Sequence, residues 1–142
     1  MKTVSVIYWS GTGNTKVMAE AIATGAREAN AEVLLLSVEE ASAEHVVNAD
    51  AIALGCPSMG AEVLEEAEME PFVSLIEGKV KEKPMALFGS YGWGNGEWME
   101  DWVQRMSLAG AKVIDAGLIA QNTPDSSSLE ACNGLGRRLA QV

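Results

Sequence analysis

Basic residues, cysteines and long apolar segments are all scarce in this sequence. Ten lysines and arginines stand against twenty aspartates and glutamates, which gives a net charge of −10. Nucleic acids and anionic membranes would repel such a surface, so we expect neither as a partner. No apolar run approaches the ~18 residues of a membrane helix, and no secretory signal precedes the first strand-like stretch. We therefore expect a cytoplasmic protein.

The scarcity of cysteine and histidine argues against a metal site and against cysteine-based catalysis. Cys56 and Cys132 lie far apart, neither belongs to a CxxC pattern, and His45 is the only histidine. The simplest interpretation is two reduced thiols in or near the core. With 142 residues, of which 48% are hydrophobic, the chain fits one domain spanning residues 1–142.

Apolar runs alternate with amphipathic stretches along the whole chain. We predict strands at residues 3–9, 32–38, 49–56, 84–90 and 112–120, the last one interrupted at Gly117. Helical periodicity predicts helices near residues 15–29, 41–48, 66–77, 97–109 and 126–141. Five near-continuous apolar strands that alternate with helices favour a doubly wound parallel sheet covered on both faces. The predicted fold is thus a single α/β domain.

A glycine-rich loop joins the first predicted strand to the first predicted helix. In doubly wound folds ligands bind at the carboxyl ends of the strands, and a helix N-terminus there attracts anions. Glycines let the backbone come close to a ligand. The loop has neither the Walker pattern nor the GxGxxG fingerprint, and Lys16 is the only nearby cation. It therefore predicts a phosphate held mainly by neutral dipoles, with these residues as ligands: Ser10, Gly11, Thr12, Gly13, Asn14 and Thr15.

This loop resembles the FMN-phosphate loop of flavodoxins, and the whole chain resembles the short-chain flavodoxins. The likeness continues through residues 54–60 (LGCPSMG), 87–94 (LFGSYGWG) and 121–122 (QN), each placed after a predicted strand. The resemblance implies a flavodoxin-like, five-stranded sheet with the strand order 2-1-3-4-5. It also implies a low-potential one-electron carrier that binds FMN non-covalently and shuttles electrons between redox enzymes.

By the same resemblance, two loops hold the flavin ring. Met59 would lie against the inner face of the ring and Trp93 over its outer face, where a thioether and an indole exclude water. The carboxylate of Glu62 would accept a hydrogen bond from the flavin N3–H. The other residues that the resemblance assigns to the cofactor are Pro57, Ser58, Gly60, Ala61, Ser90, Tyr91, Gly92, Gly94 and Asn122.

Two positions depart from the pattern of the relatives. Pro57 stands where some flavodoxins have a serine that reaches the phosphate, so this contact is either lost or passed to Ser58. Ala61 stands where relatives often have Asp, Asn or Gly. The resemblance implies that the turn 59–62 rearranges when the flavin is reduced. A positive φ at Ala61 in the rearranged turn would be opposed by its β-carbon.

Two acid-rich segments border the proposed ring site: Glu62, Glu65, Glu66, Glu68 and Glu70 in the first, and Glu97, Glu100 and Asp101 in the second. Neither segment contains a lysine or an arginine. One interpretation is the solvated start of a helix, where the helix dipole favours negative charge. The other is an acidic rim that opposes added negative charge on the flavin and transiently docks basic patches of redox partners.

An FMN-dependent NAD(P)H or quinone reductase is the main alternative function. Such an enzyme needs an open ring face for its second substrate, whereas Trp93 is expected to cover that face. The acidic segments would also repel the phosphates of a nicotinamide nucleotide. We therefore predict a monomeric electron carrier that has no catalytic residues and no metal, with other redox proteins as its partners.

Overall fold

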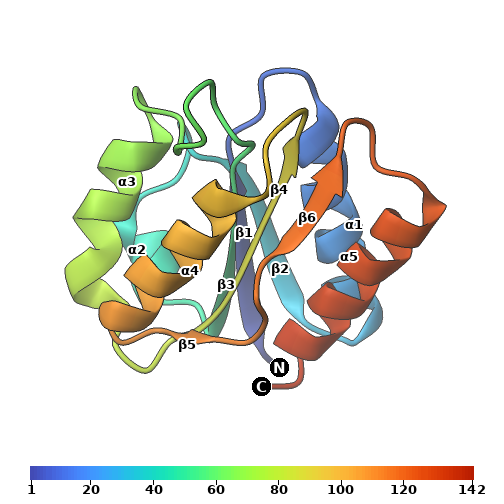
Figure 1. Ribbon diagram of the computed structural model, residues 1–142. Helices are drawn as coiled ribbons and strands as arrows, with labels where there is room; N and C mark the ends of the chain where they lie inside the picture. The colour runs from blue at the N-terminus through green and yellow to red at the C-terminus, as the bar shows by residue number, and fades with distance from the viewer.

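Strands and helices alternate along the computed structural model, which describes all residues from 1 to 142 (Figure 1). The strands are β1 (Thr3–Tyr8), β2 (Glu32–Ser37), β3 (Ala51–Gly55), β4 (Pro84–Tyr91), β5 (Lys112–Val113) and β6 (Leu118–Gln121). The helices are α1 (Asn14–Glu28), α2 (Ala43–Val47), α3 (Met69–Ile76), α4 (Glu97–Leu108) and α5 (Ser126–Leu139), and a 3-10 turn, η1 (Glu77–Lys79), follows α3. Each predicted strand and helix is present, with its ends displaced by a few residues. None of the helices combines the length and the hydropathy that crossing a bilayer requires.

All strand pairs are parallel, and the sheet has the order β2-β1-β3-β4-β5. The predicted order 2-1-3-4-5 is thus confirmed. The fifth strand, however, is divided into two pieces. The first piece, β5, pairs with the first residues of β4, and the second piece, β6, pairs with the last residues of β4. Between the two pieces Gly117 has a φ of 92°, a left-handed conformation in which an extended strand does not continue.

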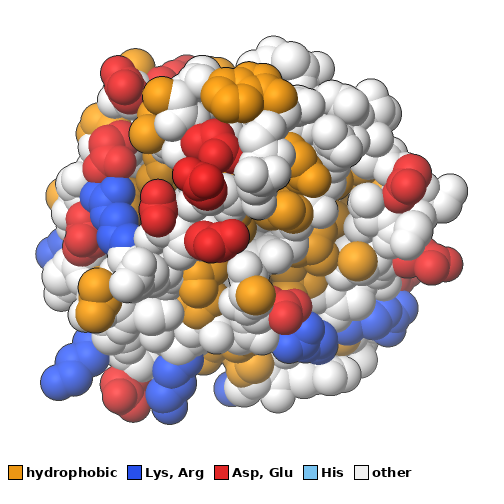
Figure 2. Space-filling model, in the orientation of Figure 1, with side chains coloured by type: hydrophobic (Ala, Val, Ile, Leu, Met, Phe, Trp, Pro, Cys, Tyr) orange, Lys and Arg blue, Asp and Glu red, His pale blue; other side chains and the backbone are white.

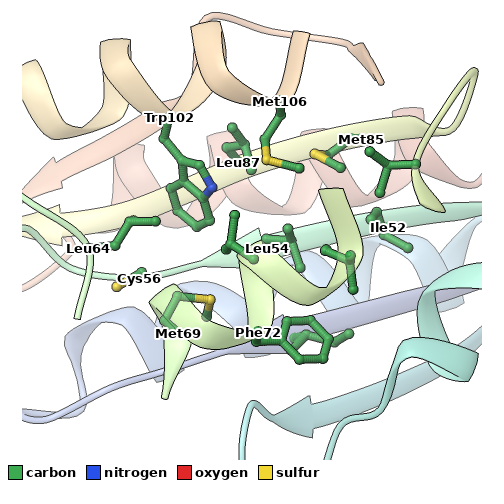
Figure 3. Close-up of a cluster of buried hydrophobic side chains, with 14 of the residues drawn as sticks. Ile52, Leu54, Cys56, Leu64, Met69, Phe72, Met85, Leu87, Trp102 and Met106 are labelled. Carbon is green, nitrogen blue, oxygen red and sulfur yellow. The ribbon is translucent and has the colours of Figure 1, made fainter. Parts of the chain in front are cut away.

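Side chains of the sheet alternate between two hydrophobic clusters, one on each face. Ile52 and Leu54 of β3 belong to the cluster under α3 and α4, whereas Ala51 and Ala53 belong to the cluster under α1 and α5. Figure 3 shows the first cluster, in which side chains of β3 and β4 meet side chains of α3 and α4. Because both faces are buried, β3 is apolar throughout, as expected for a central parallel strand.

Helices α1 and α5 pack against each other through two buried glycines. A β-carbon at Gly25 would overlap the backbone carbonyl of Asn133, and one at Gly136 would overlap the carbonyl of Ile22. At both positions the neighbour is main chain, which cannot move aside as a flexible side chain would. The two helices are therefore in direct backbone contact over the second face of the sheet.

We expect Gly136→Ala to lower the free energy of unfolding by about 1–3 kcal/mol, because a methyl group there forces the helices apart. Gly134→Ala is the matched control, since a β-carbon at this position of the same helix meets nothing within 4 Å. Alanine has a higher helix propensity than glycine, so the control should match the parent or exceed its stability by up to about 1 kcal/mol. Urea unfolding measures both changes. Equal midpoints for Gly136→Ala and the parent would show that the helices have room for the methyl group.

Candidate functional site

The residues expected to bind the cofactor all lie at one edge of the sheet, where the parallel strands end. Residues 10–15 follow β1, residues 57–62 follow β3, residues 90–94 begin in the last two residues of β4, and Asn122 directly follows β6. Figure 1 shows these loops at the upper edge of the molecule. Segments far apart in the sequence thus meet where doubly wound folds bind ligands.

Ser10 closes the loop between β1 and α1. Its Oγ accepts hydrogen bonds from the backbone N–H groups of Gly13 (3.1 Å) and Lys16 (3.3 Å), so its own proton remains available for donation. Gly13 has a φ of 100° and immediately precedes α1, a left-handed conformation that suits glycine. The loop is therefore shaped by its own hydrogen bonds.

The start of α1 presents unpaired backbone donors. The N–H groups of Gly11, Thr12 and Thr15 have no acceptor within the protein, and the first turn of α1 contains no acidic residue. Lys16 is exposed, so the positive potential here comes mainly from backbone dipoles. A hollow of about 380 Å³ adjoins the loop, and Trp9 and Lys16 contribute to its lining. This arrangement is typical of an anion site at a helix N-terminus.

A buried pair of hydroxyl groups links α1 to the end of β4. Thr15 and Ser90 are 0% and 5% exposed, their Oγ atoms lie 3.1 Å apart, and the N–H of Ser90 also donates to Thr15 Oγ1 (3.3 Å). Only one of the two hydroxyl protons can lie in the bond between them, so the other has no acceptor within the chain. A buried donor without an acceptor is unfavourable. An oxygen atom of a ligand would complete the pair.

Backbone hydrogen bonds tie the segments that follow β3 and β6 to the end of β4. The N–H of Ser58 donates to the carbonyl of Ser90 (3.0 Å), and the N–H of Asn122 donates to the carbonyl of Tyr91 (2.7 Å). Pro57 and Ser58 are half-buried. The structure therefore brings together the residues that the resemblance assigned to the ring and to the sugar chain of a flavin.

The two residues expected to cover the flavin ring differ in exposure. Met59 is half-buried, whereas Trp93 is 63% exposed and stands between Gly92 and Gly94, both exposed as well. An indole this exposed contributes little to the core, so its apolar faces remain available for a ligand. Trp98, by contrast, belongs to α4 and is buried.

The turn after β3 places its one positive φ at Glu62. The N–H of Glu62 donates to the carbonyl of Met59 (2.7 Å), and the N–H of Met59 donates to the carbonyl of Val63 (3.0 Å). Glu62 has a φ of 53°, and neither Gly60 nor Ala61 has a positive φ. In this conformation the strained residue is thus Glu62 and not Ala61. The rearranged turn, with its positive φ at Ala61, stays a prediction.

The carboxylate of Glu62 lies between the loops after β3 and β4. Its Oε1 accepts a hydrogen bond from the backbone N–H of Gly96 (3.2 Å), directly before α4. A β-carbon at Gly94 would overlap the same carboxylate. Glu62 has no basic partner among the ion pairs of the chain. Its negative charge is therefore held between the two loops by backbone dipoles alone.

Glu65, in the first acid-rich segment, caps α3. This residue is only 6% exposed, and its carboxylate accepts hydrogen bonds from the N–H groups of Ala67 (2.6 Å), Glu68 (2.9 Å) and Met69 (2.9 Å). Negative charge at a helix start is favoured by the dipole. The interpretation as a helix start holds for Glu65, although this residue is buried and not solvated.

Glu70, in the same segment, is paired with a cation from another helix. Its two carboxylate oxygens accept hydrogen bonds from the guanidinium of Arg105 in α4, at 2.8 Å and 2.7 Å. These bonds lower the pKa of Glu70 below its ordinary value. Arg105 lies 35 positions away along the chain, so no pattern within the segment could reveal the pair.

The remaining acids form part of an acidic area on the surface. Figure 2 shows this area over α3 and α4, with most of the basic side chains along the lower edge of the molecule. The exposed members of the two acid-rich segments, which we call the acidic rim, are Glu66, Glu97, Glu100 and Asp101.

Both cysteines are free and buried, as predicted. Burial raises the pKa of the Cys56 thiol and that of the Cys132 thiol to about 12. Cys56 lies at the end of β3, where its Sγ accepts the N–H of Glu65 (3.4 Å). Both groups are protonated at neutral pH and act as small apolar side chains.

Comparison with known proteins agrees with this geometry. A flavodoxin family model matches residues 6–134, nearly the whole chain. The chain belongs to the flavodoxin family. It is 45% identical to a flavodoxin of Clostridium beijerinckii, over 98% of this chain and 100% of the relative. It is 43% identical to a flavodoxin of Megasphaera elsdenii, over 98% and 99% respectively. The solution structure of the two-electron reduced Megasphaera elsdenii flavodoxin matches with a TM-score of 0.88, over 98% of this chain and 99% of that one.

As a flavodoxin, the protein is an FMN-binding electron carrier and not an enzyme, and these relatives do not favour the reductase alternative. The edge of the sheet fits FMN. Unpaired N–H groups at the start of α1 and the spare hydroxyl proton of Thr15 and Ser90 suit phosphate and polyol oxygens. The half-buried thioether of Met59 and the exposed indole of Trp93 suit an aromatic ring.

We expect Glu70→Gln to lower stability at neutral pH and to make little difference in acid. Because Arg105 lowers the pKa of Glu70, the pair stabilises the fold above the ordinary carboxyl range, and its contribution is lost as the pH falls through the lowered pKa. Both side chains are partly exposed, so the loss at neutral pH should be about 0.5–1 kcal/mol. Urea unfolding across this pH range measures it, with the exposed Glu66→Gln as control. A difference from the parent that stays constant with pH would contradict the pairing.

Proposed function

We propose that the flavodoxin loop 10–15 and the start of α1 hold the FMN phosphate. The observation that carries this proposal is the set of N–H groups of Gly11, Thr12 and Thr15 without an acceptor, at the end of a helix with no acid in its first turn. The proton of Ser10 Oγ adds a further donor. The half-buried Ser58 is a candidate for the contact that some flavodoxins make from the position of Pro57.

The loops after β3 and β4 would hold the flavin ring. In this proposal the ring lies between Met59 and Trp93, and Glu62 accepts the hydrogen bond of the flavin N3–H. Backbone groups of residues 59–62 and 91–92 bind the remaining polar atoms of the ring. Ser90 and Asn122 bind the ribityl chain. The resemblance to flavodoxins and the hydrogen bonds that join these loops support the assignment.

When bound, FMN supplies the one-electron redox chemistry, and the chain determines where that chemistry occurs and at what potential. Met59 and Trp93 exclude water from the ring faces, which disfavours charge on the ring. The carboxylate of Glu62, which has no cationic partner, disfavours added negative charge further. Both effects make the reduced carrier a strong reductant.

The acidic rim would be the docking surface for redox partners with basic patches. Such interfaces are small, short-lived and sensitive to salt, because exposed charges are screened. The net charge of −10 also opposes self-association, which supports a monomer. Free, buried Cys56 and Cys132 agree with a reducing compartment, which supports a cytoplasmic carrier.

We expect the protein to bind one FMN per chain, and to bind riboflavin at least about 100-fold more weakly. Riboflavin lacks only the phosphate, and hydrogen bonds to a charged group are worth about 1.5–3 kcal/mol each. Titration of the flavin-free chain, followed by quenching of flavin fluorescence, measures both dissociation constants. FAD is a second comparison and should also bind weakly, because the loop 10–15 suits one terminal phosphate monoester. Equal affinities for FMN and riboflavin would show that the loop 10–15 does not bind the phosphate.

Glu62→Gln should raise the midpoint potential for the second electron, because it removes a negative charge while keeping a hydrogen-bond acceptor. An interaction of about 1–2 kcal/mol, reduced by solvent, corresponds to about 40–90 mV for one electron. Potentiometric titration of the holoprotein gives the value. Glu66→Gln, which removes an exposed charge from the same segment, should shift this potential much less. A potential that is unchanged or lower in Glu62→Gln would show that this carboxylate does not face the flavin.

A further inference from the structure

Trp9 connects the phosphate loop to the start of α3. Its backbone N–H donates to the carbonyl of Gly55 (2.9 Å), which extends the pairing of β1 with β3 by one residue. The indole is half-buried against the hydrophobic cluster under α3 and α4. Its Nε1–H donates to Glu68 Oε1 at 3.2 Å. The orientation of the indole is therefore fixed by a carboxylate 59 positions away along the chain.

The backbone of the phosphate loop rests on this indole. A β-carbon at Gly11 would lie 3.1 Å from Cη2 and 3.3 Å from Cζ3 of Trp9, so the main chain is already in contact with the six-membered ring. Gly11 does not have a positive φ. The absence of a side chain at this position thus serves the close approach to Trp9 and not a special backbone conformation.

Glu68 is itself held firmly and has no cation as partner. Its N–H donates to the capping carboxylate of Glu65 (2.9 Å), and its carbonyl accepts the N–H of Phe72 (3.2 Å). No lysine or arginine pairs with its carboxylate. An unpaired acid beside an anion-binding loop works against anion binding through its charge. Its hydrogen bond to Trp9 gives a reason for the carboxylate at this position.

We propose that Glu68 is a positioning residue for the phosphate loop. Its hydrogen bond fixes the Trp9 indole, and the indole in turn fixes the position of the main chain at Gly11. In this position the free N–H groups of the loop point toward one phosphate. Glu68 thereby contributes to the preference of this protein for a flavin with a terminal phosphate. This inference rests on the proposed assignment of the FMN phosphate to the loop 10–15.

The test compares the affinities for FMN and riboflavin in the full chain and in four variants. Glu68→Ala removes the acceptor, and Glu68→Gln keeps an acceptor while removing the charge. Trp9→Phe keeps an aromatic ring under Gly11 but removes the indole N–H, and the double variant Trp9→Phe/Glu68→Ala closes a cycle. The measured quantity is the ratio of the riboflavin and FMN dissociation constants. Because riboflavin uses the same ring loops, its own affinity reports whether those loops remain intact.

We expect Glu68→Ala to reduce this ratio about fivefold to tenfold, which corresponds to about 1–1.4 kcal/mol, with little change in riboflavin affinity. Trp9→Phe should give a similar reduction, the double variant no more than either single variant, and Glu68→Gln a ratio near that of the parent or above it. An unchanged ratio in Glu68→Ala, an equal loss for both flavins, or additive effects in the double variant would overturn the inference. A parent protein that does not distinguish the two flavins would instead refute the phosphate assignment itself.

Discussion

Parallel pairing of β1, β3 and β4 is the constraint on which the site depends. Because these strands run in one direction, the loops that follow them emerge at the same edge of the sheet. Burial of both faces fixes the register of β3. A shift of one residue would move Ile52 and Leu54 into the cluster under α1 and α5, and would move Ala51 and Ala53 into the cluster under α3 and α4. Helices α1 and α5, in backbone contact with each other, cover the second face. In this arrangement the start of α1 lies against the end of β4, where Thr15 contacts Ser90.

Neither the loop 10–15 nor the acid-rich segment 62–70 contains a lysine or an arginine. A cation beside the loop 10–15, the proposed phosphate site, would strengthen FMN binding, but it would also stabilise negative charge on the flavin and so weaken the carrier as a reductant. The chain instead offers the fixed dipoles of a helix start and of hydroxyl groups, with Lys16 exposed. Arg105, which forms an ion pair with the acid-rich segment 62–70, is engaged by both Glu70 and Glu77.

The sequence predicted the strands and helices well, because burial of a periodic face is a requirement that recurs along the chain. The division of the fifth strand was visible as an interruption at Gly117, but its consequence, two short pieces on one edge, depends on a φ of 92°. Helix α3 was expected from residue 66 and begins at Met69, because the preceding turn is held by the Glu65 carboxylate. That cap requires a buried acid, which composition does not predict.

Contacts between segments far apart in the sequence were the least predictable part of the structure. The hydrogen bond from Trp9 to Glu68 links the residue after β1 to the residue before α3, and the pair of Arg105 with Glu70 links α4 to α3. Their geometry exists only once α3 has docked against its neighbours, so neither residue spacing nor resemblance indicated them. Resemblance did indicate which loops meet, because the glycine-rich and hydroxyl-rich segments carry the pattern of the family. It drew attention to strain at Ala61, whereas the turn as it stands places the positive φ on Glu62.

The acids of the segment 62–70 cannot be treated as one charge. Glu65 is compensated by backbone N–H groups, Glu68 by an indole N–H and Glu70 by a guanidinium. Only Glu62 combines partial burial with a place between the loops after β3 and β4 and the lack of a cation. The acidic rim is exposed, so salt screens its field within about 8 Å at physiological ionic strength. If Glu62 faces the flavin and the rim docks redox partners, as we propose, the potential depends chiefly on Glu62 and partner recognition on the rim. On this proposal the rim can change during adaptation to new partners with little effect on the potential.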